Sequence, residues 1–342
     1  MIDLRSDTVT RPSPAMWDAM ANAELGDDDR EGDPTVRRLQ ELAAEKLGKE
    51  AALFVPSGTM GNLLAHLAHC NYGAEVIISD RAHTFTSETT NACAVHGISL
   101  KQIPTTGPFL DTEKVEAAIR PSRRICPYTE MVWVENTQVG YGGMLMPLEN
   151  MAAIQAVAVK HGLKVHMDGA RIFNAAVALG VDASEVAQYT DSVMFCISKG
   201  LSAPVGSLLV GSAKFIEEAT WHCKRIGGRM RQAGIIAAAG VVALEQMIDR
   251  LQEDHDNARF LAERLSEIPA LDIDLNQVQT NIILARSNSS RFDQEQAAEA
   301  LEKNGVWVLH LGTNILRFVT HYGITRDDCA RAAAICRDVL SE

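Results

Sequence analysis

The stretch Asp191-Ser-Val-Met-Phe-Cys-Ile-Ser-Lys-Gly-Leu-Ser-Ala-Pro-Val-Gly-Ser-Leu-Leu-Val-Gly211 places a lysine between two apolar runs. The first run, 193–197, predicts a buried strand, and the second, 207–210, predicts another. Because an isolated buried ammonium is costly, Lys199 requires either a charged partner or a covalent bond that removes its charge. A lysine at the end of a strand is also commonly a surface residue. The sequence around Lys199 leaves these three interpretations open.

Similar apolar runs alternate with helical patterns through the middle of the chain. They predict strands at Ala51–Val55, Glu75–Ser79, Ile98–Ile103, Met131–Glu135, Lys164–Asp168, Ser192–Ile197 and Gly206–Val210. Helical patterns cover Gly61–His69, Leu148–His161 and Ile172–Leu179. Strands rich in Val and Ile that alternate with helices indicate an α/β fold whose mostly parallel seven-stranded sheet is covered on both faces.

A different order of elements follows the sheet. One long helix is predicted over Gln232–Asp256, and the remaining elements are helix Asp256–Ser266, strands Leu271–Asp274 and Asn281–Ala285, helix Arg291–Lys303, strands Val306–Leu311 and Ile315–Thr320, and helix Thr325–Leu340. This order predicts a smaller α+β unit. We therefore expect a large domain with the N-terminal segment at 1–250 and a small domain at 251–342.

Composition narrows the classes of partner and the compartment. The formal net charge of -12 argues against a nucleic-acid partner. No apolar run approaches the length of a membrane span, and the N-terminal residues lack the features of a signal peptide. The seven cysteines are scattered, odd in number and without Cys-x-x-Cys spacing, which suits a reducing cytoplasm and predicts no metal site.

Three sequence features together point to a cofactor site, because ligands of open α/β sheets bind beyond the carboxyl ends of strands. Lys199, Asp168 and Glu135 all lie at such ends. The loop Pro56–Asn62 follows a strand and opens a helix, and its small residues would let backbone N–H groups of Gly58 and Thr59 bind a phosphate. The alternative for this loop is an ordinary turn capped by Ser or Thr.

Asp168 is a natural partner for a buried cation. In enzymes that use pyridoxal phosphate (PLP), that cation is the protonated pyridine nitrogen, whose charge makes the ring an electron sink. The alternative is that Asp168 caps the helix that follows it. The phosphate loop, the acid and the lysine, in this order, favour a PLP site in which Lys199 holds the cofactor as a Schiff base.

Histidine and arginine side chains extend the predicted site. His83, just past a strand, is either a loop residue or an imidazole that stacks on the cofactor ring and transfers protons. Arg171 follows Asp168 by one turn, and Arg317 lies in an apolar strand, so both are candidates to bind a carboxylate. The basic segment Lys224–Arg231 is either an anion-binding loop or a solvated turn.

The chain resembles a known family in six segments. These are Ile2-Asp-Leu-Arg-Ser-Asp-Thr-Val-Thr-Arg11, Gly48-Lys-Glu-Ala-Ala-Leu-Phe-Val-Pro-Ser-Gly-Thr-Met-Gly-Asn62, His166-Met-Asp-Gly-Ala-Arg-Ile-Phe-Asn174, Ser198-Lys-Gly-Leu201, Met230-Arg-Gln-Ala-Gly-Ile235 and Arg317-Phe-Val-Thr-His321. They are similar to the low-specificity L-threonine aldolases, which are PLP enzymes of fold type I, the fold of aspartate aminotransferase. The similarity extends from the first residues to the last strand.

The resemblance implies a role for each matching residue. Lys199 would hold PLP, Asp168 would pair with the pyridine nitrogen, and Gly58 and Thr59 would bind its phosphate. Ser6, Arg171 and Arg317 would bind the substrate carboxylate, while His83 would stack on the ring and help to deprotonate the β-hydroxyl. Lys224 and Arg231 would reach the phosphate region of a neighbouring subunit, which implies at least a dimer and, from the family, a homotetramer.

Three segments and one further position, Cys126, depart from the family pattern. The family's Gly-Asp-Asp-Val-Tyr-Gly-Glu-Asp-Pro is here Gly26-Asp-Asp-Asp-Arg-Glu-Gly-Asp-Pro34, so Arg30 replaces an aromatic residue. The family's Glu-Asn-Thr-His-Asn is here Glu135-Asn-Thr-Gln-Val139, Cys126 stands where relatives often have histidine, and Arg229 replaces the third glycine of a loop. Arg30 and Arg229 could bind a second acidic group, as in 3-hydroxyaspartate, or pair with Asp28, Asp29 or Glu31.

The resemblance implies an aldolase that cleaves L-threonine, L-allo-threonine or related L-β-hydroxy amino acids to glycine and an aldehyde. A β-eliminating lyase or transaldolase that acts on a β-substituted, even acidic, amino acid is the alternative on the same scaffold. A non-catalytic binding protein with the same fold is a third hypothesis, which the presence of Lys199, Asp168 and His83 disfavours.

Overall fold

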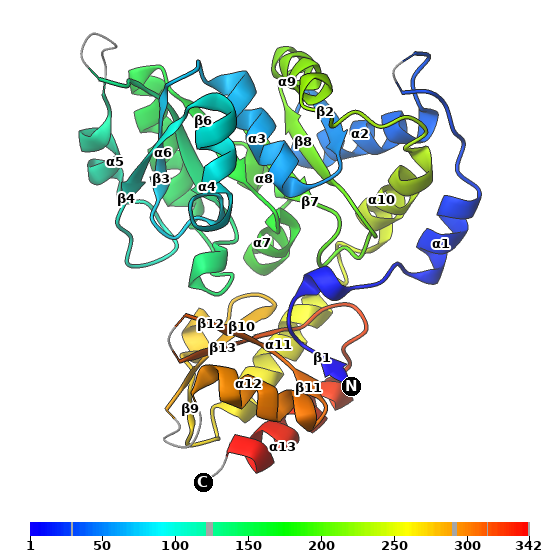
Figure 1. Cartoon of the computed structure of the whole chain (residues 1–342), viewed down its shortest axis with the longest axis vertical. Helices are drawn as coiled ribbons and strands as arrows, with labels where there is room; N and C mark the ends of the chain where they lie inside the picture. The colour runs from blue at the N-terminus through cyan, green and yellow to red at the C-terminus, as the bar shows by residue number, and fades with distance from the viewer. Residues whose placement is uncertain (29, 121–125, 289–292, 313, 341–342) are drawn as a thin grey trace.

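The computed structural model describes residues 1–342 except 29, 121–125, 289–292, 313 and 341–342. Figure 1 shows two units, a larger one that carries the helices up to α10 and a smaller one below it that carries α11, α12 and α13. Both ends of the chain lie at the smaller unit. The expected domain limits, 1–250 and 251–342, stay a prediction.

The larger unit is built on a seven-stranded sheet with the order β2-β8-β7-β6-β5-β3-β4. Strand β8 runs antiparallel to both of its neighbours, and the other pairs are parallel. The mostly parallel seven-stranded sheet predicted from the apolar runs is therefore confirmed. The strands are β2 (Ala51–Val55), β3 (Glu75–Ser79), β4 (Ser99–Ile103), β5 (Thr129–Glu135), β6 (Lys164–Asp168), β7 (Ser192–Cys196) and β8 (Ser207–Gly211).

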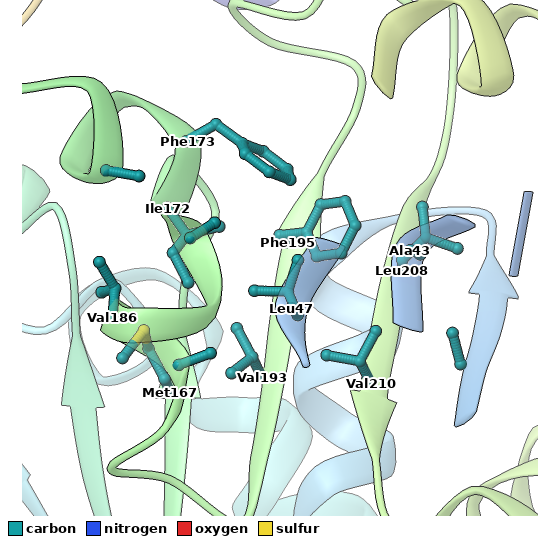
Figure 2. Packing of buried hydrophobic residues seen from close by; sticks show 14 of the residues in the cluster. Ala43, Leu47, Met167, Ile172, Phe173, Val186, Val193, Phe195, Leu208 and Val210 are labelled. Carbon is teal, nitrogen blue, oxygen red and sulfur yellow. The ribbon is translucent and has the colours of Figure 1, made fainter. Parts of the chain in front are cut away.

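Alternation along the strands divides the large core into two layers, because successive side chains of a strand point to opposite faces. On β7, Val193 and Phe195 pack into one cluster, whereas Met194 and Cys196 belong to the other. Figure 2 shows Phe195 and Val193 beside side chains of the helix that carries Ile172 and Phe173. Both faces are thus apolar, which explains the continuous apolar runs in the sequence.

Helices cover both faces. The first face carries α1 (Pro14–Ala21), α2 (Pro34–Leu47), α5 (Thr112–Ala118), α6 (Leu148–His161), α7 (Ile172–Leu179), α8 (Ala183–Ala187) and α10 (Gly234–Gln246). The other face carries α3 (Gly58–His69), α4 (His83–His96) and α9 (Ala213–Arg225). Among the described residues, no helix combines the length and apolarity needed to cross a membrane.

Helix α2 shows how local signals set its limits. Asp33 caps it by accepting hydrogen bonds from the N–H groups of Thr35 and Val36, and Pro34 occupies the first turn, where its missing N–H costs nothing. The helix ends at Gly48, whose φ of 61° lies in the left-handed region. Asp33 also accepts from the backbone N–H of Gly234, which attaches the start of α2 to the start of α10.

The smaller unit contains a four-stranded sheet with the order β12-β13-β10-β9, in which neighbouring strands are antiparallel. The N-terminal strand β1 (Ile2–Asp3) joins this unit by pairing with β11 (Val306–Trp307). The other elements are β9 (Leu271–Asp272), β10 (Ile282–Ser287), β12 (Leu309–Leu311), β13 (Ile315–Val319), α11 (Leu251–Leu265), α12 (Gln294–Lys303) and α13 (Arg326–Leu340).

Two sequence expectations are wrong in this region. The long helix predicted over 232–256 is two helices, because α10 ends at Gln246 and α11 begins at Leu251. Apolar periodicity continues through Met247 and Leu251, which are both buried, so the break has no signal in the pattern. The strand predicted over 306–311 is also two strands, because its first part pairs with β1 and its second part pairs with β13.

Candidate active site

A cavity of about 480 Å³ opens at the carboxyl ends of β5, β6 and β7. Its volume lies within the range of small-molecule sites. The predicted residues that line it are Ser6, Gly58, Thr59, His83, Asp168, Arg171, Lys199 and Arg317. Four predicted residues, Arg30, Lys224, Arg229 and Arg231, do not line it.

Lys199 follows β7 and is held through its backbone. Its carbonyl oxygen accepts hydrogen bonds from the hydroxyl of Thr10, at 3.0 Å, and from the N–H of Ser202, at 2.8 Å. Within the described part of the chain, no carboxylate lies within ion-pair distance of its Nζ atom, so the salt-bridge interpretation has no partner residue there. The amine is therefore available to the cavity.

Asp168 ends β6 and is 2% exposed. Its carboxylate accepts hydrogen bonds from the Asn62 amide, at 2.9 Å, and from the backbone N–H of Ala170, at 3.1 Å. Burial, and then the charge of Glu88, raise the pKa of Asp168, although Lys199 acts in the opposite direction. The helix-cap interpretation is wrong, because α7 has Arg171 at its cap position.

The N-terminus of α3 faces the same cavity. Ser57 caps the helix by accepting a hydrogen bond from the N–H of Met60. A Cβ atom on Gly58 would lie 3.0 Å from Sγ of Cys196, so a side chain there would force its neighbours to move. The Thr59 hydroxyl donates to Oε1 of Glu88, at 2.8 Å. The backbone N–H groups and the positive end of the helix dipole therefore remain as the means of binding an anion.

His83 is the first residue of α4 rather than a loop residue. Its backbone N–H donates to Oε2 of Glu135 at 2.7 Å, and its Nδ1 atom lies 3.4 Å from Oε1 of Glu88. The interaction with Glu88 is the largest influence on the imidazole and raises the pKa of His83, against burial, which lowers it. The charges of Asp168 and Glu135 act in the same direction as Glu88.

Glu135 ends β5 directly beside Asp168 in the paired strand register. Its Oε1 atom accepts the N–H of Val139 at 2.8 Å, and the side chain is 6% exposed in the folded chain. Burial, followed by the charge of Asp168, raises the pKa of Glu135 to about 8. Three acidic side chains, those of Asp168, Glu88 and Glu135, thus surround one end of the cavity.

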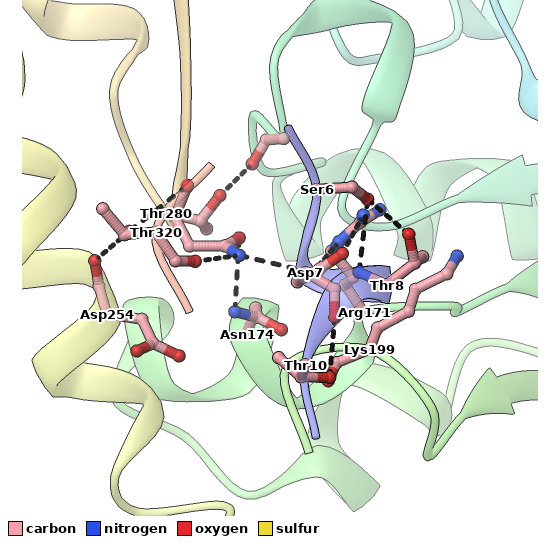
Figure 3. Close-up of polar contacts among 12 residues, drawn as sticks. Ser6, Asp7, Thr8, Thr10, Arg171, Asn174, Lys199, Asp254, Thr280 and Thr320 are labelled. Atoms are coloured by element: carbon pink, nitrogen blue, oxygen red, sulfur yellow. Dashed lines mark hydrogen bonds and ion pairs between the residues drawn. The ribbon is translucent and has the colours of Figure 1, made fainter. Parts of the chain in front are cut away.

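Two arginines, Arg171 and Arg317, also line the cavity. Arg171 forms a two-point ion pair with Asp7, with Nε to Oδ2 at 2.6 Å and Nη2 to Oδ1 at 2.7 Å, as Figure 3 shows. Burial acts against ionisation of Asp7, but Arg171 outweighs it and holds the pKa of Asp7 well below its usual range. The Nη2 atom of Arg317 donates to the Arg5 carbonyl oxygen, while its buried Nε atom has no partner among the described residues.

Asp7 also links the site to the smaller unit. Asn281, at the start of β10, donates to Oδ2 of Asp7 at 3.3 Å and to the carbonyl oxygen of Thr320 at 3.0 Å. The Thr320 hydroxyl in turn donates to the carbonyl oxygen of Asp254 on α11 (Figure 3). Arg171 is thereby held between the two units, and Arg317 enters the cavity from β13.

The basic residues outside the cavity lie beside an acidic loop. Arg229 contacts Asp28 at 2.9 Å, and Arg231 contacts Asp27 at 3.2 Å. The Arg30 side chain is 79% exposed and lies 3.7 Å from Asp27. Lys224 belongs to the last turn of α9 rather than to the loop after it. Of the acids expected to pair with Arg30 and Arg229, Asp29 lies outside the described residues.

The departures just before and just after β5 differ in whether they line the cavity. Gln138 is buried and uses its side-chain oxygen to accept the N–H of Gly140, and it does not line the cavity. Val139 does line it, so the change that reaches the site is that from the family's asparagine to Val139. Cys126 is half-buried and lies outside the cavity lining.

Sequence reasoning did not single out Asp7, Asn62 or Glu88. Asp7 and Asn62 lie within the segments that carry the family resemblance, so the resemblance offered a signal for both. Glu88 lies on α4, five residues after His83, in a helix with no other acid. Its contacts with Thr59 and Asn62 depend on the packing of α4 against α3, which no local pattern gives.

Comparison with known proteins places the chain in a family. The sequence profile of the β-eliminating lyases matches residues 3–288. The chain is 45% identical over 332 residues to the probable low-specificity L-threonine aldolase 2 of Arabidopsis thaliana, covering 96% of this chain and 94% of the relative. It is 43% identical over 342 residues to the low specificity L-threonine aldolase of Escherichia coli K12, covering 100% of both.

A structural comparison agrees on the fold. The solved structure of the Leishmania major threonine aldolase superposes with a TM-score of 0.83 at 19% identity, and it covers 100% of both chains. The chain therefore belongs to the β-eliminating lyase family, and within it to the low-specificity L-threonine aldolases.

Proposed function

We propose that this protein is a PLP-dependent carbon–carbon lyase that cleaves L-threonine, L-allo-threonine or related L-β-hydroxy amino acids to glycine and an aldehyde. One observation carries the proposal. A free amine at Lys199, a buried acid at Asp168 and the N-terminus of α3 meet around a single cavity that Arg317 also lines. The relatives named above as threonine aldolases support the same reaction.

The residues present fit the cofactor. Asp168 is buried and, among the described residues, has no arginine or lysine within ion-pair distance, so a protonated pyridine nitrogen would supply the missing positive charge. The first turn of α3 would hold the phosphate through the N–H groups of Gly58 and Thr59. Lys199 would hold the cofactor through its ε-amine, and the exposed side of the His83 imidazole would lie against the ring.

Each remaining group has a task during cleavage. The bound cofactor supplies an electron sink for the pair released when a bond to Cα breaks. Arg317, with Ser6 and Arg171, would fix the substrate carboxylate and so orient the Cα–Cβ bond for cleavage. His83 would accept the proton of the β-hydroxyl, and Glu88 beside it would stabilise the resulting positive charge. Substrate binding would also exclude water from the acidic end of the cavity.

We further propose that the protein is at least a dimer and, from the family, a homotetramer, and that it acts in the cytoplasm. The family places Lys224 and Arg231 at a neighbouring subunit's phosphate, and both lie outside this chain's own cavity. The scattered set of seven cysteines supports a reducing compartment. The mass in solution, measured by light scattering, distinguishes dimer from tetramer.

One experiment distinguishes the aldolase from a β-eliminating lyase and from a non-catalytic binding protein. The purified protein is supplied with PLP and assayed with L-threonine, L-allo-threonine, L-serine and 3-hydroxyaspartate, with glycine and aldehyde as the expected products. A 2-oxo acid in place of glycine would indicate β-elimination, and a protein that binds no PLP would favour a non-catalytic role. Preference for 3-hydroxyaspartate would support substrate contacts by Arg30 and Arg229, which pair with local acids in this chain.

The matched control uses two lysines. Lys199→Ala should lower kcat by about 10³-fold or more, because the covalent attachment of the cofactor is lost. Lys214→Ala, on the exposed first turn of α9, should behave as the wild type. Equal activity of the Lys199 variant and the wild type would contradict the proposed site.

A further inference from the structure

Glu88 has a set of contacts that neither the sequence nor the family resemblance assigned. Its Oε1 atom accepts the Thr59 hydroxyl at 2.8 Å and lies 3.4 Å from Nδ1 of His83. Its Oε2 atom accepts the Asn62 amide at 3.1 Å, and the same amide nitrogen donates to Asp168 at 2.9 Å. One side chain on α4 therefore connects three parts of the site.

The carboxylate of Glu88 is buried, and a buried negative charge is costly unless a cation or hydrogen-bond donors lie near it. Glu88 is 6% exposed, and its charged side chain has no arginine or lysine within ion-pair distance in the described part of the chain. Burial alone would raise the pKa of Glu88, but hydrogen bonds from His83, Asn62 and Thr59 outweigh it and keep the pKa below its usual value. Glu88 is thus an ionised acid, and His83 is the basic group that lies within ion-pair distance of it among the described residues.

Other charged groups face the same imidazole. Asp168 approaches from the end of β6 and Glu135 from the end of β5, and both favour a protonated ring. Lys199 lies across the cavity, where its charge acts on Asp168. Glu88 differs from these acids because it is the one whose oxygen lies within ion-pair distance of a ring nitrogen.

We propose that Glu88 is a positioning residue, which holds the His83 ring through Nδ1 and ties it to Asp168 through Asn62 and to the phosphate-binding turn through Thr59. This inference rests on the proposed function. With Nδ1 next to Glu88, the Nε2 atom on the other side of the ring is the one left for a substrate. When the O–H bond of the β-hydroxyl breaks, its proton forms an N–H bond at Nε2, and the ionised Glu88 stabilises the imidazolium.

The arrangement also assigns the Thr59 side chain. Because its hydroxyl donates to Glu88, Thr59 would contact a phosphate through its backbone N–H. The position of the first turn of α3 and the orientation of His83 are therefore coupled through one carboxylate. Loss of that carboxylate should affect the imidazole more than the affinity for the substrate.

The test compares Glu88→Gln with the wild type, both loaded with PLP, over a range of pH with L-threonine as the substrate. Glutamine keeps the shape but removes the charge, so the pKa of His83 should fall and the acid limb of the kcat/KM profile should move to lower pH. We expect kcat to fall about 10- to 100-fold, with KM changed less than threefold. Glu88→Asp, which keeps the charge, should leave the acid limb nearer to that of the wild type.

The matched control is Glu75→Gln, which removes another buried acid, 2% exposed, that pairs with Arg120 far from the cavity. It should change stability without moving the pH profile. An unshifted acid limb in Glu88→Gln, or an equal shift in Glu75→Gln, would overturn the proposal.

A second measurement does not depend on activity or on a folded Glu88 variant. The imidazole of His83 is titrated by NMR in the wild-type protein loaded with PLP, and its signal is identified by its absence in His83→Asn. A midpoint above the ordinary value of about 6.5 is expected beside Glu88 and the acids that act in the same direction, and a midpoint at or below it contradicts the role of Glu88. A wild type that releases no glycine would overturn the proposed function, while this titration would still decide the role of Glu88.

Discussion

Two groups of charged residues line the cavity, and their charges are paired differently. We call Arg171 and Arg317 the arginine side, and Asp168, Glu88 and Glu135 the acidic side. On the arginine side, Arg171 is already neutralised by the buried carboxylate of Asp7. On the acidic side, Asp168 and Glu135 lie side by side at the ends of two strands, without an arginine or lysine in ion-pair distance among the described residues. Arg171 is thus paired within the protein alone, whereas Asp168 and Glu135 are not paired with an arginine or lysine among the described residues.

This difference indicates which charges are paired within the protein and which are left for a ligand. The Asp7–Arg171 pair fixes a buried cation and joins the two units, whereas Asp168 is buried without an arginine or lysine in ion-pair distance among the described residues. Arg317 differs from both Arg171 and Asp168. Burial lowers the pKa of its guanidinium, and repulsion from Arg171 lowers it further. Its Nε atom has no hydrogen-bond partner among the described residues. An incoming carboxylate would satisfy Arg317, and an incoming pyridinium would satisfy Asp168.

The largest expected effect is on stability at the arginine side. Asp7→Asn removes one partner of a fully buried ion pair and leaves Arg171 uncompensated, which should lower the free energy of unfolding by about 3–5 kcal/mol. Urea unfolding at pH 7 measures it. Asp3→Asn, which breaks the half-exposed pair with Arg5, is the control and should cost about 1 kcal/mol or less.

The same pair makes a prediction about pH. The folded-state pKa of Asp7 is depressed, so its stabilising contribution is present above the unfolded value of about 3.9 and is lost as the pH falls toward the folded value. The difference in stability between the wild type and Asp7→Asn should therefore narrow when unfolding is measured below about pH 4. A difference that stays constant down to pH 3 would contradict the ion pair.

The same change on the acidic side should act on activity instead. Asp168→Asn removes the charge that a pyridinium would require, so kcat should fall about 10²- to 10³-fold and the affinity for PLP should weaken. Because burial raises the pKa of Asp168, the protein without cofactor should be as stable as the wild type or more stable. The control is Asp191→Asn, at the other end of the sheet beside Lys164, which should retain activity. A strong loss of stability in Asp168→Asn would contradict the view that Asp168 is unpaired in the protein without cofactor.

The smallest expected effect is at Arg317. Arg317→Lys keeps the charge but loses the planar two-point geometry, so KM for L-threonine should rise about 10- to 100-fold while PLP binding is retained. Steady-state kinetics together with the absorbance of the bound cofactor separate the two quantities. Arg259→Lys, an exposed pair on α11, provides the control. Loss of PLP binding in Arg317→Lys would place Arg317 in the cofactor site instead.

Particular residues show how far the sequence could predict this protein. The strands of the large sheet were predicted to within two residues at each end, because both faces are covered and the apolar runs are continuous. The break between α10 and α11 was missed, since buried residues continue through it. The strand over 306–311 was predicted as one, because the change of pairing partner at Val308 leaves the apolar pattern unaltered.

The same distinction, between what a local pattern shows and what depends on tertiary contacts, applies to the residues of the site. Lys199 and Asp168 were found from their place at strand ends, Arg171 from its place one turn after Asp168 and Arg317 from its place in an apolar strand. The resemblance supplied Ser6. The structure brings all five to one cavity. Asp7 was not found because its partner, Arg171, lies far along the chain. Glu88 was not found because it contacts Thr59 on the neighbouring helix α3.

The sequence by itself determined the alternating α/β order, the family and the residue types at the ends of the central strands, because these depend on local periodicity and short motifs. The tertiary structure alone decided which charges are paired. Asp7 is 164 residues from Arg171, and Glu88 reaches Thr59 and Asn62 only because α4 packs beside α3. Burial makes those pairings decisive, because a charge away from water must find its partner within the fold or in a ligand.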